Sequence, residues 1–116
     1  MHLSLAKSVI VGLVLGLVAC MPNYSNQEIQ AIAQSVKAGE ITMYSTQSCP
    51  YCRQMRNWLN SHSFVFKECD IEVNEVCRQE YDRYGGEGVP FIRVWRNQKQ
   101  TLIQGGDGYA LLDALK

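Results

Sequence analysis

Cys49 and Cys52 are separated by two residues (CPYC) and lie where a strand pattern changes to a helix pattern. The preceding residues 41–45 (ITMYS) have strand character, and apolar side chains recur at helical spacing over residues 50–62. Pro50 suits the first position of a helix, where its missing N–H would have no intrahelical partner. The sequence therefore predicts a strand–turn–helix unit whose helix begins next to the Cys49 sulfur.

This placement favours redox chemistry at Cys49. The free amides of the first helical turn, including that of Cys52, would point at the Cys49 sulfur, and the helix dipole adds roughly half a positive charge there. Both effects stabilise the thiolate and lower the thiol pKa from ~8.5 towards the ~3.5–7 range of such motifs. Cys52, one turn further along the helix, lacks this stabilisation, and we expect it to be the buried resolving thiol.

Two other interpretations of the cysteine pair follow from the residues themselves. A zinc site would need further ligands from Cys69, Cys77 or His62, but the sequence has no second closely spaced cysteine pair. A plain structural disulfide is the other alternative, although it would not require Pro-Tyr at the start of a helix.

The rest of the chain alternates helix and strand patterns. The order α-β-α-β-α-β-β-α predicts a parallel first strand pair with a right-handed crossover, and an antiparallel last pair joined by a short polar turn. We therefore expect a small mixed sheet with helices on both faces. The remaining elements are a helix that starts with a capping box at 25–28 and stops at Gly39, a strand at 64–68, a helix over 73–84 closed by Gly85-Gly86, strands at 91–95 and 101–104, and a last helix from about Tyr109.

Length and charge limit the classes of protein to consider. The chain has 116 residues, which is room for one folded domain. Its formal net charge is +0, and Lys and Arg occur singly rather than in runs. We expect a monomer with no nucleic-acid partner.

The N-terminal segment has the pattern of an export signal. Lys7 precedes an apolar run at 8–20 (SVIVGLVLGLVAC), which is too short to span a bilayer that needs ~20 apolar residues. The run ends in Leu-Val-Ala-Cys20, which resembles the lipobox of bacterial lipoproteins. That resemblance implies that residues 1–19 are removed and that Cys20 is acylated. The alternatives are an ordinary cleaved signal with an incidental Cys20 and a permanent helical anchor.

The lipobox resemblance also implies a location. The protein would be exported and lipid-anchored to the bacterial membrane, facing the periplasm. The residue after Cys20 is Met21, rather than the Asp that often signals retention at the inner membrane among lipoproteins. This favours the outer membrane over the inner one.

Three motifs in order resemble the glutaredoxin family: CPYC at 49–52, Val89-Pro90 before a strand, and Gly-Gly-Asp at 105–107 before the last helix. The resemblance implies an α/β thioredoxin-like (glutaredoxin-type) fold, a mixed four-stranded sheet flanked by helices, over residues 40–116. Residues 20–39 would then hold the lipidated cysteine, a short linker and an N-terminal helix. An iron–sulfur cluster shared with glutathione also occurs among glutaredoxins, but the proline inside the motif argues against it.

The resemblance also assigns roles to residues around the two catalytic cysteines. It implies a cis-proline at Pro90 that packs on the CPYC motif and helps to exclude metal, and a Val89 backbone that pairs with an incoming peptide or glutathione like an added strand. From sequence alone Pro90 could instead mark a turn or sheet edge, and Asp107 could simply cap the last helix. The implied supporting residues are Pro50, Tyr51 and Pro90, and the implied substrate- or glutathione-binding residues are Tyr51, Val89, Pro90, Gly106 and Asp107.

Two positions depart from the family pattern. Thr46 replaces a lysine that usually meets a glutathione carboxylate, and Gly88 replaces the usual threonine before Val89. Arg53 or Arg56 would have to supply the missing cation. These departures leave glutathione affinity open without affecting the dithiol chemistry.

Cys69 and Cys77 complete the cysteine count. If Cys20 is acylated, four of the five cysteines remain, an even number that fits an oxidising compartment. We interpret Cys69 and Cys77 as a structural disulfide. Two buried thiols and a second redox couple are the alternatives.

The sequence therefore predicts a thiol–disulfide oxidoreductase of the bacterial cell envelope that works through a mixed disulfide with protein thiols or glutathione. We expect no bound cofactor and no metal, with glutathione as a candidate co-substrate. The alternative function is a non-catalytic envelope module that uses the same fold to bind a protein or a metal ion.

Overall fold

The computed structural model describes residues 23–116, so the predicted signal peptide at 1–19 and the lipidation site Cys20 lie outside the described residues. Within 23–116, no helix combines the length and the apolar character needed to cross a membrane. The elements are α1 (Asn26–Ser35), β1 (Ile41–Ser45), α2 (Pro50–Ser61), β2 (Lys67–Asp70), α3 (Glu75–Arg83), β3 (Phe91–Arg96), β4 (Lys99–Gln104) and α4 (Gly108–Leu115).

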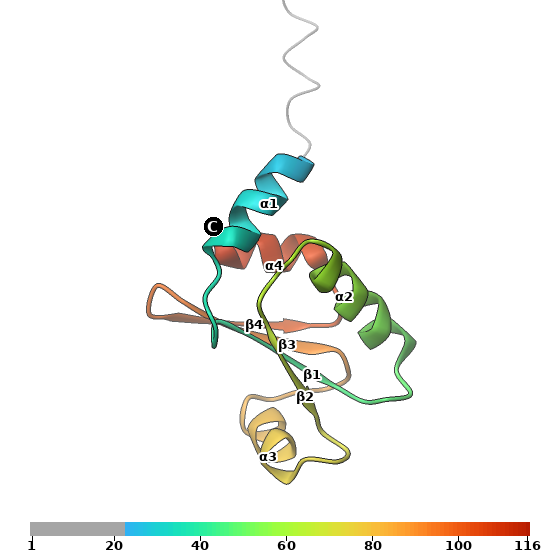
Figure 1. Ribbon diagram of the computed structural model, residues 1–116. Coiled ribbons are helices and arrows are strands. Elements are labelled where there is room, and N and C mark those ends of the chain that lie inside the picture. Colours follow the sequence, from blue (N-terminus) through green and yellow to red (C-terminus); the bar gives the residue numbers. More distant parts are fainter. Residues whose placement is uncertain (1–22) are drawn as a thin grey trace, which may run out of the picture.

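The four strands form one mixed sheet in the order β2-β1-β3-β4 (Figure 1). Strand β1 pairs with β2 in parallel and with β3 antiparallel, and β3 pairs antiparallel with β4. This confirms the predicted thioredoxin-like fold. Because Tyr44 of β1 is paired with Phe91 of β3, the chain that leaves β1 lies next to the chain that enters β3.

Helices cover both faces of the sheet (Figure 1). Side chains of α1, α2 and α4 form the larger hydrophobic core with one face, whereas α3 packs on the other face. Successive strand residues point to opposite faces, so Met43 enters the larger core and Tyr44 the smaller one. The smaller core consists of Tyr44, Cys69, Cys77, Tyr81 and Phe91.

Helix α1 starts as predicted but ends early. The Glu28 N–H donates to Ser25 Oγ (3.1 Å) and the Ser25 N–H donates to Glu28 Oε1 (3.2 Å), which is the predicted capping box. The helix ends at Ser35 rather than at Gly39, because Val36 is extended and buries its side chain in the larger core.

The second strand is shifted from the predicted 64–68 to Lys67–Asp70. Phe64 is instead part of the turn after α2, where its N–H donates to the Leu59 carbonyl (3.0 Å) and its ring enters the larger core. The ladder with β1 begins only where Thr42 meets Lys67. Apolar character at Phe64 thus reflects core packing rather than strand pairing.

The third helix is shorter than the predicted 73–84. It is capped by Asn74, whose Oδ1 accepts the Cys77 N–H, and it therefore begins at Glu75. Val73 and Val76, two apolar residues within the predicted range, are 72% and 61% exposed. The buried stripe consists of Cys77 and Tyr81, four residues apart on one side of the helix.

A two-residue turn joins β3 to β4 within the predicted polar segment. Asn97 and Gln98 both have positive φ values, 53° and 61°, and Arg96 is paired with Lys99. This is the left-handed geometry that suits the twist of a hairpin. Both strands are longer than predicted because pairing extends up to the turn.

Candidate active site

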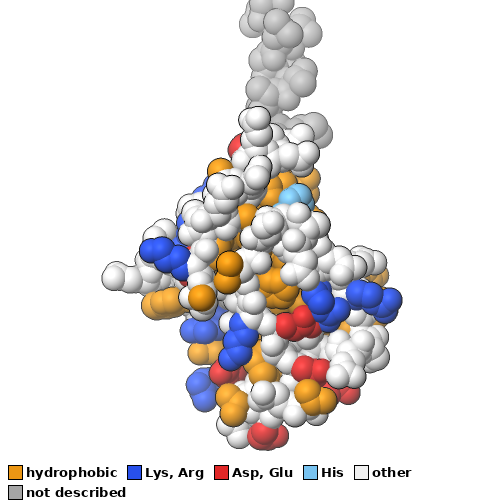
Figure 2. All heavy atoms as spheres, in the orientation of Figure 1, with side chains coloured by type: hydrophobic (Ala, Val, Ile, Leu, Met, Phe, Trp, Pro, Cys, Tyr) orange, Lys and Arg blue, Asp and Glu red, His pale blue; other side chains and the backbone are white. Residues whose placement is uncertain are grey.

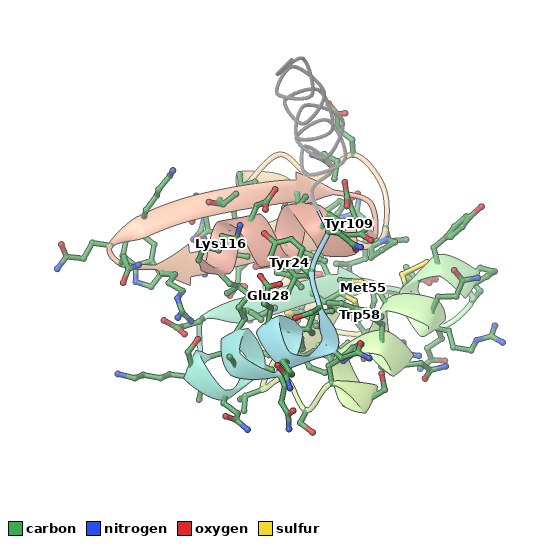
Figure 3. The ribbon with its side chains drawn as sticks, turned by 90° about the horizontal axis from the view of Figure 1, so that it is seen from above. Tyr24, Glu28, Met55, Trp58, Tyr109 and Lys116 are labelled. Carbon is green, nitrogen blue, oxygen red and sulfur yellow. A yellow bond between two sulfur atoms is a disulfide. The ribbon has the colours of Figure 1, made fainter. Side chains whose placement is uncertain are left out.

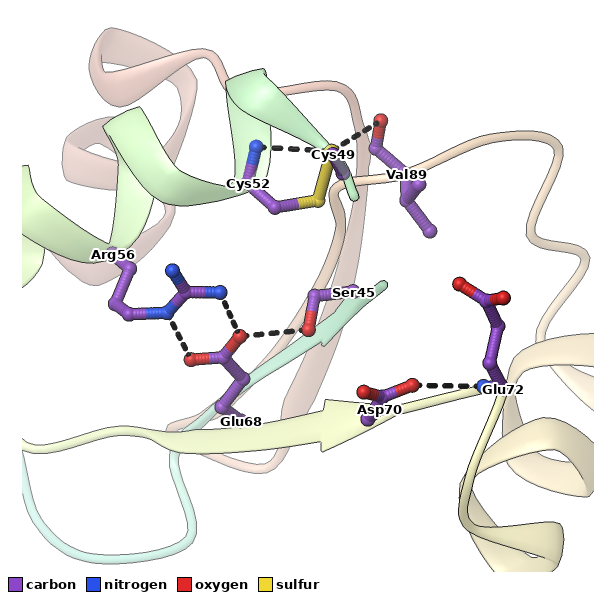
Figure 4. A network of polar contacts seen from close by, with 8 residues as sticks. All are labelled: Ser45, Cys49, Cys52, Arg56, Glu68, Asp70, Glu72 and Val89. Carbon is purple, nitrogen blue, oxygen red and sulfur yellow. Dashed lines mark hydrogen bonds and ion pairs between the residues drawn. A yellow bond between two sulfur atoms is a disulfide. The ribbon is translucent and has the colours of Figure 1, made fainter. Parts of the chain in front are cut away.

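Cys49 is the N-cap residue of α2, with Pro50 at the first helical position. Its Sγ accepts the N–H of Cys52 at 3.0 Å (Figure 4). In this structure Cys49 and Cys52 form a disulfide whose Cα atoms are 5.2 Å apart. The first-turn amide therefore lies where it would stabilise a thiolate on Cys49 once the disulfide is reduced.

The two sulfur-bearing residues differ in exposure. Cys49 is half-buried at the surface, whereas Cys52 is 0% exposed and lies on the core side of α2. An external disulfide can therefore reach Cys49 and not Cys52. Pro50 and Tyr51, between them, are exposed, and Tyr51 is 69% accessible.

Val89 and Pro90 lie directly beside this motif. The Val89–Pro90 peptide bond is cis, and Pro90 is fully buried. The Val89 carbonyl oxygen is 3.7 Å from Cys49 Sγ (Figure 4). The sheet register brings these residues together, because Pro90 immediately precedes β3 and Cys49 follows β1.

The loop before Val89 is held by two side chains from other elements. The Tyr81 hydroxyl of α3 donates to the Gly88 carbonyl (3.2 Å). Gln104 of β4 donates through Nε2 to the Gly85 carbonyl (3.0 Å) and accepts the Glu87 N–H through Oε1 (3.2 Å). The sequence predicted Tyr81 as a helix residue without this role. Its hydroxyl was the available signal, because a buried tyrosine needs a hydrogen-bond partner.

Arg56 is engaged in an ion pair on α2 and is not a free cation for glutathione. Its Nε donates to Glu68 Oε1 (2.6 Å), and Glu68 Oε2 also accepts the Ser45 hydroxyl (2.8 Å; Figure 4). The Arg56 guanidinium, followed by the Ser45 hydroxyl, holds the pKa of Glu68 below its usual value despite partial burial. Of the two cations suggested by the sequence, Arg53 is the exposed one, and Thr46 is half-buried.

Gly106 and Asp107 lie at the start of α4. Asp107 Oδ1 accepts the N–H groups of Tyr109 (3.0 Å) and Ala110 (3.1 Å), so it has the capping role that the sequence offered as an alternative. A Cβ atom at Gly106 would lie 3.4 Å from the Pro90 ring, which places this glycine against the active-site proline. A contact of either residue with glutathione stays a prediction.

Cys69 and Cys77 are joined by a disulfide with Cα atoms 5.4 Å apart, and both residues are buried. They lie in the core under α3, so their sulfurs are not ligands of a metal at Cys49. Across residues 23–116, no group of three or more His, Cys, Asp and Glu side chains is arranged to hold a metal ion.

The surface around these elements carries mixed charge. Figure 2 shows basic and acidic side chains interspersed on one face of the molecule. Among the hollows in residues 23–116, two lie beside the Pro90 and Tyr51 sides of the cysteine motif. One of about 320 Å³ is lined by residues 87–90 and 104–105. The other, of about 250 Å³, is lined by Tyr51, Gln54, Met55, Trp58, Gly106 and Gly108.

Comparison with known proteins identifies related sequences. The glutaredoxin family model matches residues 41–98. N-acetyl-S-hydroxy-L-cysteine reductase of Bacillus subtilis is 32% identical over 68 residues, which cover 57% of this chain and 73% of that protein. The glutaredoxin-like protein NrdH of Lactococcus lactis is 27% identical over 52 residues, 45% of this chain and 72% of that protein.

Solved structures share the fold at lower identity. The glutaredoxin grx-1 from Archaeoglobus fulgidus superposes with a TM-score of 0.51 at 19% identity, covering 82% of this chain and 99% of that one. The thioredoxin-like protein BC3987 gives a TM-score of 0.55 at 17% identity, covering 65% of this chain and 99% of that one.

Proposed function

The chain belongs to the glutaredoxin family and is a thiol oxidoreductase, and on that premise we propose that it exchanges disulfides in the bacterial cell envelope through Cys49 and Cys52. The observation that carries the assignment of roles is the difference between the two sulfurs. Cys49 is accessible and faces a first-turn amide, whereas Cys52 is buried one turn along α2. Cys49 is therefore the nucleophile and Cys52 the resolving residue.

The reaction proceeds in two exchanges. The Cys49 thiolate attacks one sulfur of a substrate disulfide, that S–S bond breaks, and the other substrate sulfur leaves as a thiolate that takes up a proton. Cys52 then loses its proton and attacks the Cys49 sulfur of the mixed disulfide, releasing the second substrate sulfur as a thiol. Two electrons have moved to the substrate, and the protein holds the Cys49–Cys52 disulfide that the structure contains. An external thiol reductant returns it to the dithiol.

The Val89 backbone is the proposed docking edge for the substrate. Its carbonyl lies 3.7 Å from the nucleophilic sulfur, and the cis bond to Pro90 sets its direction. An extended chain that pairs with this edge would bring its own disulfide to Cys49. Because Arg56 is paired with Glu68 and Thr46 replaces the expected lysine, we propose protein disulfides as the main substrates, with weak binding of glutathione.

Trapping tests the two roles. With a disulfide-containing protein such as insulin, Cys52→Ser should accumulate a covalent adduct at Cys49, because the second exchange is blocked. Cys49→Ser should form none, because Cys52 is buried. A stable adduct on Cys52 in the Cys49→Ser variant, or none on Cys49 in the Cys52→Ser variant, would contradict the assignment.

The proposed location rests on the sequence of the N-terminal segment. Export, acylation at Cys20 and a periplasm-facing location are inferred from the apolar run at 8–20 and its lipobox-like end. Metabolic labelling with an alkyne fatty acid should tag the wild-type chain and leave Cys20→Ser untagged. Density-gradient separation should then place the tagged wild-type protein in the outer-membrane fraction. Recovery of the wild-type protein untagged in the cytoplasm would contradict export.

A further inference from the structure

The smaller of the two hollows beside the CPYC motif forms a groove between α2 and the start of α4. One wall is a single face of α2, with Tyr51, Met55 and Trp58 at helical spacing, and the other wall begins at Gly106 and Gly108. Along a helix that rises 1.5 Å per residue, the seven steps from Tyr51 to Trp58 span roughly 10 Å, the length of about three extended residues. The groove, hereafter the α2–α4 groove, is continuous with the reactive site, since Gly106 lies against the Pro90 ring.

The side chains that line the α2–α4 groove carry no charge, and the lining is part apolar and part polar. Gln54 is the most polar of the six residues that line it. A further hollow of about 120 Å³ extends the α2–α4 groove past Trp58 and Gly108 to Tyr24 and Tyr109. Figure 3 shows Trp58, Tyr24 and Tyr109 close together. Glutathione carries two carboxylates and an ammonium group, and no side chain in this lining carries a charge that could pair with them.

The aromatic wall is preorganised. The Trp58 ring stacks on Phe64 with centroids 5.5 Å apart and meets the edge of His62 at 4.8 Å. A ring fixed in this way loses little side-chain entropy when a ligand covers its free face. Met55, which also lines the groove, can adapt to different apolar shapes.

On these grounds, and resting on the proposed disulfide exchange, we propose that the α2–α4 groove binds an aromatic or large aliphatic side chain of the protein substrate. The residue that provides it lies a few positions from the substrate cysteine that joins Cys49. Groove occupancy gives protein disulfides an advantage over glutathione disulfides that the cysteine motif alone would not give.

Gly108 offers a way to fill the groove without disturbing the fold. A Cβ atom there would lie 3.6 Å from the Trp58 ring, an ordinary contact, and the φ of Gly108 is not in the left-handed region. Gly108 is also the first residue of α4, where a larger side chain suits the helix better than glycine. Gly108→Leu should occupy the groove, and Gly108→Ala should narrow it.

The test uses the pre-reduced protein and thionitrobenzoate mixed disulfides, which release a coloured thiolate when Cys49 attacks. One series consists of short peptides with a single cysteine and one tryptophan moved from five positions before to five positions after it. The reference compounds are the same peptide with serine in place of tryptophan and the glutathione mixed disulfide. We expect at least one tryptophan position to react about tenfold faster than its serine counterpart, the factor that partial burial of a large aromatic side chain provides.

In Gly108→Leu this preference should fall to about one, and in Gly108→Ala to an intermediate value, because the rate of the tryptophan peptide falls towards that of its serine counterpart. Leu102→Ala is the matched control and should retain the preference. Leu102 is exposed and points away from the larger core, because its neighbour Ile103 points into that core. Equal rates for all peptides, or a preference retained in Gly108→Leu, would overturn the proposal. Failure of the proposed function would look different, since no substrate would then release thionitrobenzoate.

Discussion

The Cys69–Cys77 disulfide should stabilise the domain through the loop that it closes. It links β2 to α3 across a sequence separation of 8 residues, and both sulfurs lie in the smaller core. In the chain-entropy model, closing a loop of that length removes enough freedom from the unfolded chain to stabilise the fold by about 2.5 kcal/mol at 25 °C. This is a substantial share of the ~5–15 kcal/mol that holds a typical domain together.

The Cys49→Ser/Cys52→Ser double variant isolates this bond, because it leaves Cys69 and Cys77 as the only pair in residues 23–116. Urea unfolding of that variant with and without a thiol reductant should then differ in midpoint by roughly 1–2.5 M, with little change in slope, given slopes of ~1–3 kcal/mol/M. The comparison changes no side chain, so packing losses do not enter it.

Alkylation of the denatured, unreduced variant provides the control. It should modify neither Cys69 nor Cys77. Modification of both would mean that they are buried thiols, the alternative left open by the sequence. A protected pair with coincident unfolding midpoints would refute the entropic reasoning.

Four further substitutions, one of them a control, probe the ion pair and the loop that position the site. Glu68→Gln should lower the free energy of unfolding by roughly 1 kcal/mol at neutral pH. Because Arg56 lowers the pKa of Glu68 in the folded state, the wild type should lose this extra stability as the pH falls below the ordinary value of 4.5. The stability curves of the two proteins, measured by urea unfolding at different pH values, should therefore converge in acid. Tyr81→Phe removes the hydrogen bond to Gly88 and should lower the free energy of unfolding by about 0.5–1.5 kcal/mol. If that bond positions Val89, kcat/KM for a protein disulfide should fall several-fold while the reduction potential stays unchanged. An unchanged kcat/KM would mean that Tyr81 contributes to stability alone. Gly86→Ala would place a Cβ atom 2.2 Å from the Tyr81 ring and should destabilise the domain by about 1–3 kcal/mol in thermal unfolding, whereas Gly88→Ala, with no atom within 4 Å, should change it by less than about 0.5 kcal/mol.

Element order and fold class were predictable because they depend on short-range patterns. The capping box at Ser25, the helical stripe after Cys49 and the turn between the last strands each act over a few residues. The predictions were wrong where an apolar residue is compatible with more than one local structure. Phe64 fitted the predicted strand at 64–68 and is a core residue of a turn, and the apolar Val73 and Val76 fitted the predicted helix at 73–84 but are exposed.

The parts of the site that sequence reasoning missed come from contacts between distant segments. The Arg56–Glu68 pair joins residues 12 apart, and the contact between Gln104 and Gly85 joins residues 19 apart. No local pattern marks such pairs, since both partners are ordinary surface residues. They become visible only when the strands and helices are placed against one another.

What the sequence by itself determined is the local redox unit: a cysteine at the start of a helix, a proline that permits that start and a second cysteine one turn on. Those properties follow from helix geometry, which fixes where amides and side chains lie within a few residues. The tertiary structure decided what surrounds the sulfur. Antiparallel pairing of β1 with β3 brings Val89, forty residues away, to Cys49, and packing of α4 against α2 shapes the α2–α4 groove, because strand pairing and core packing act across the whole chain.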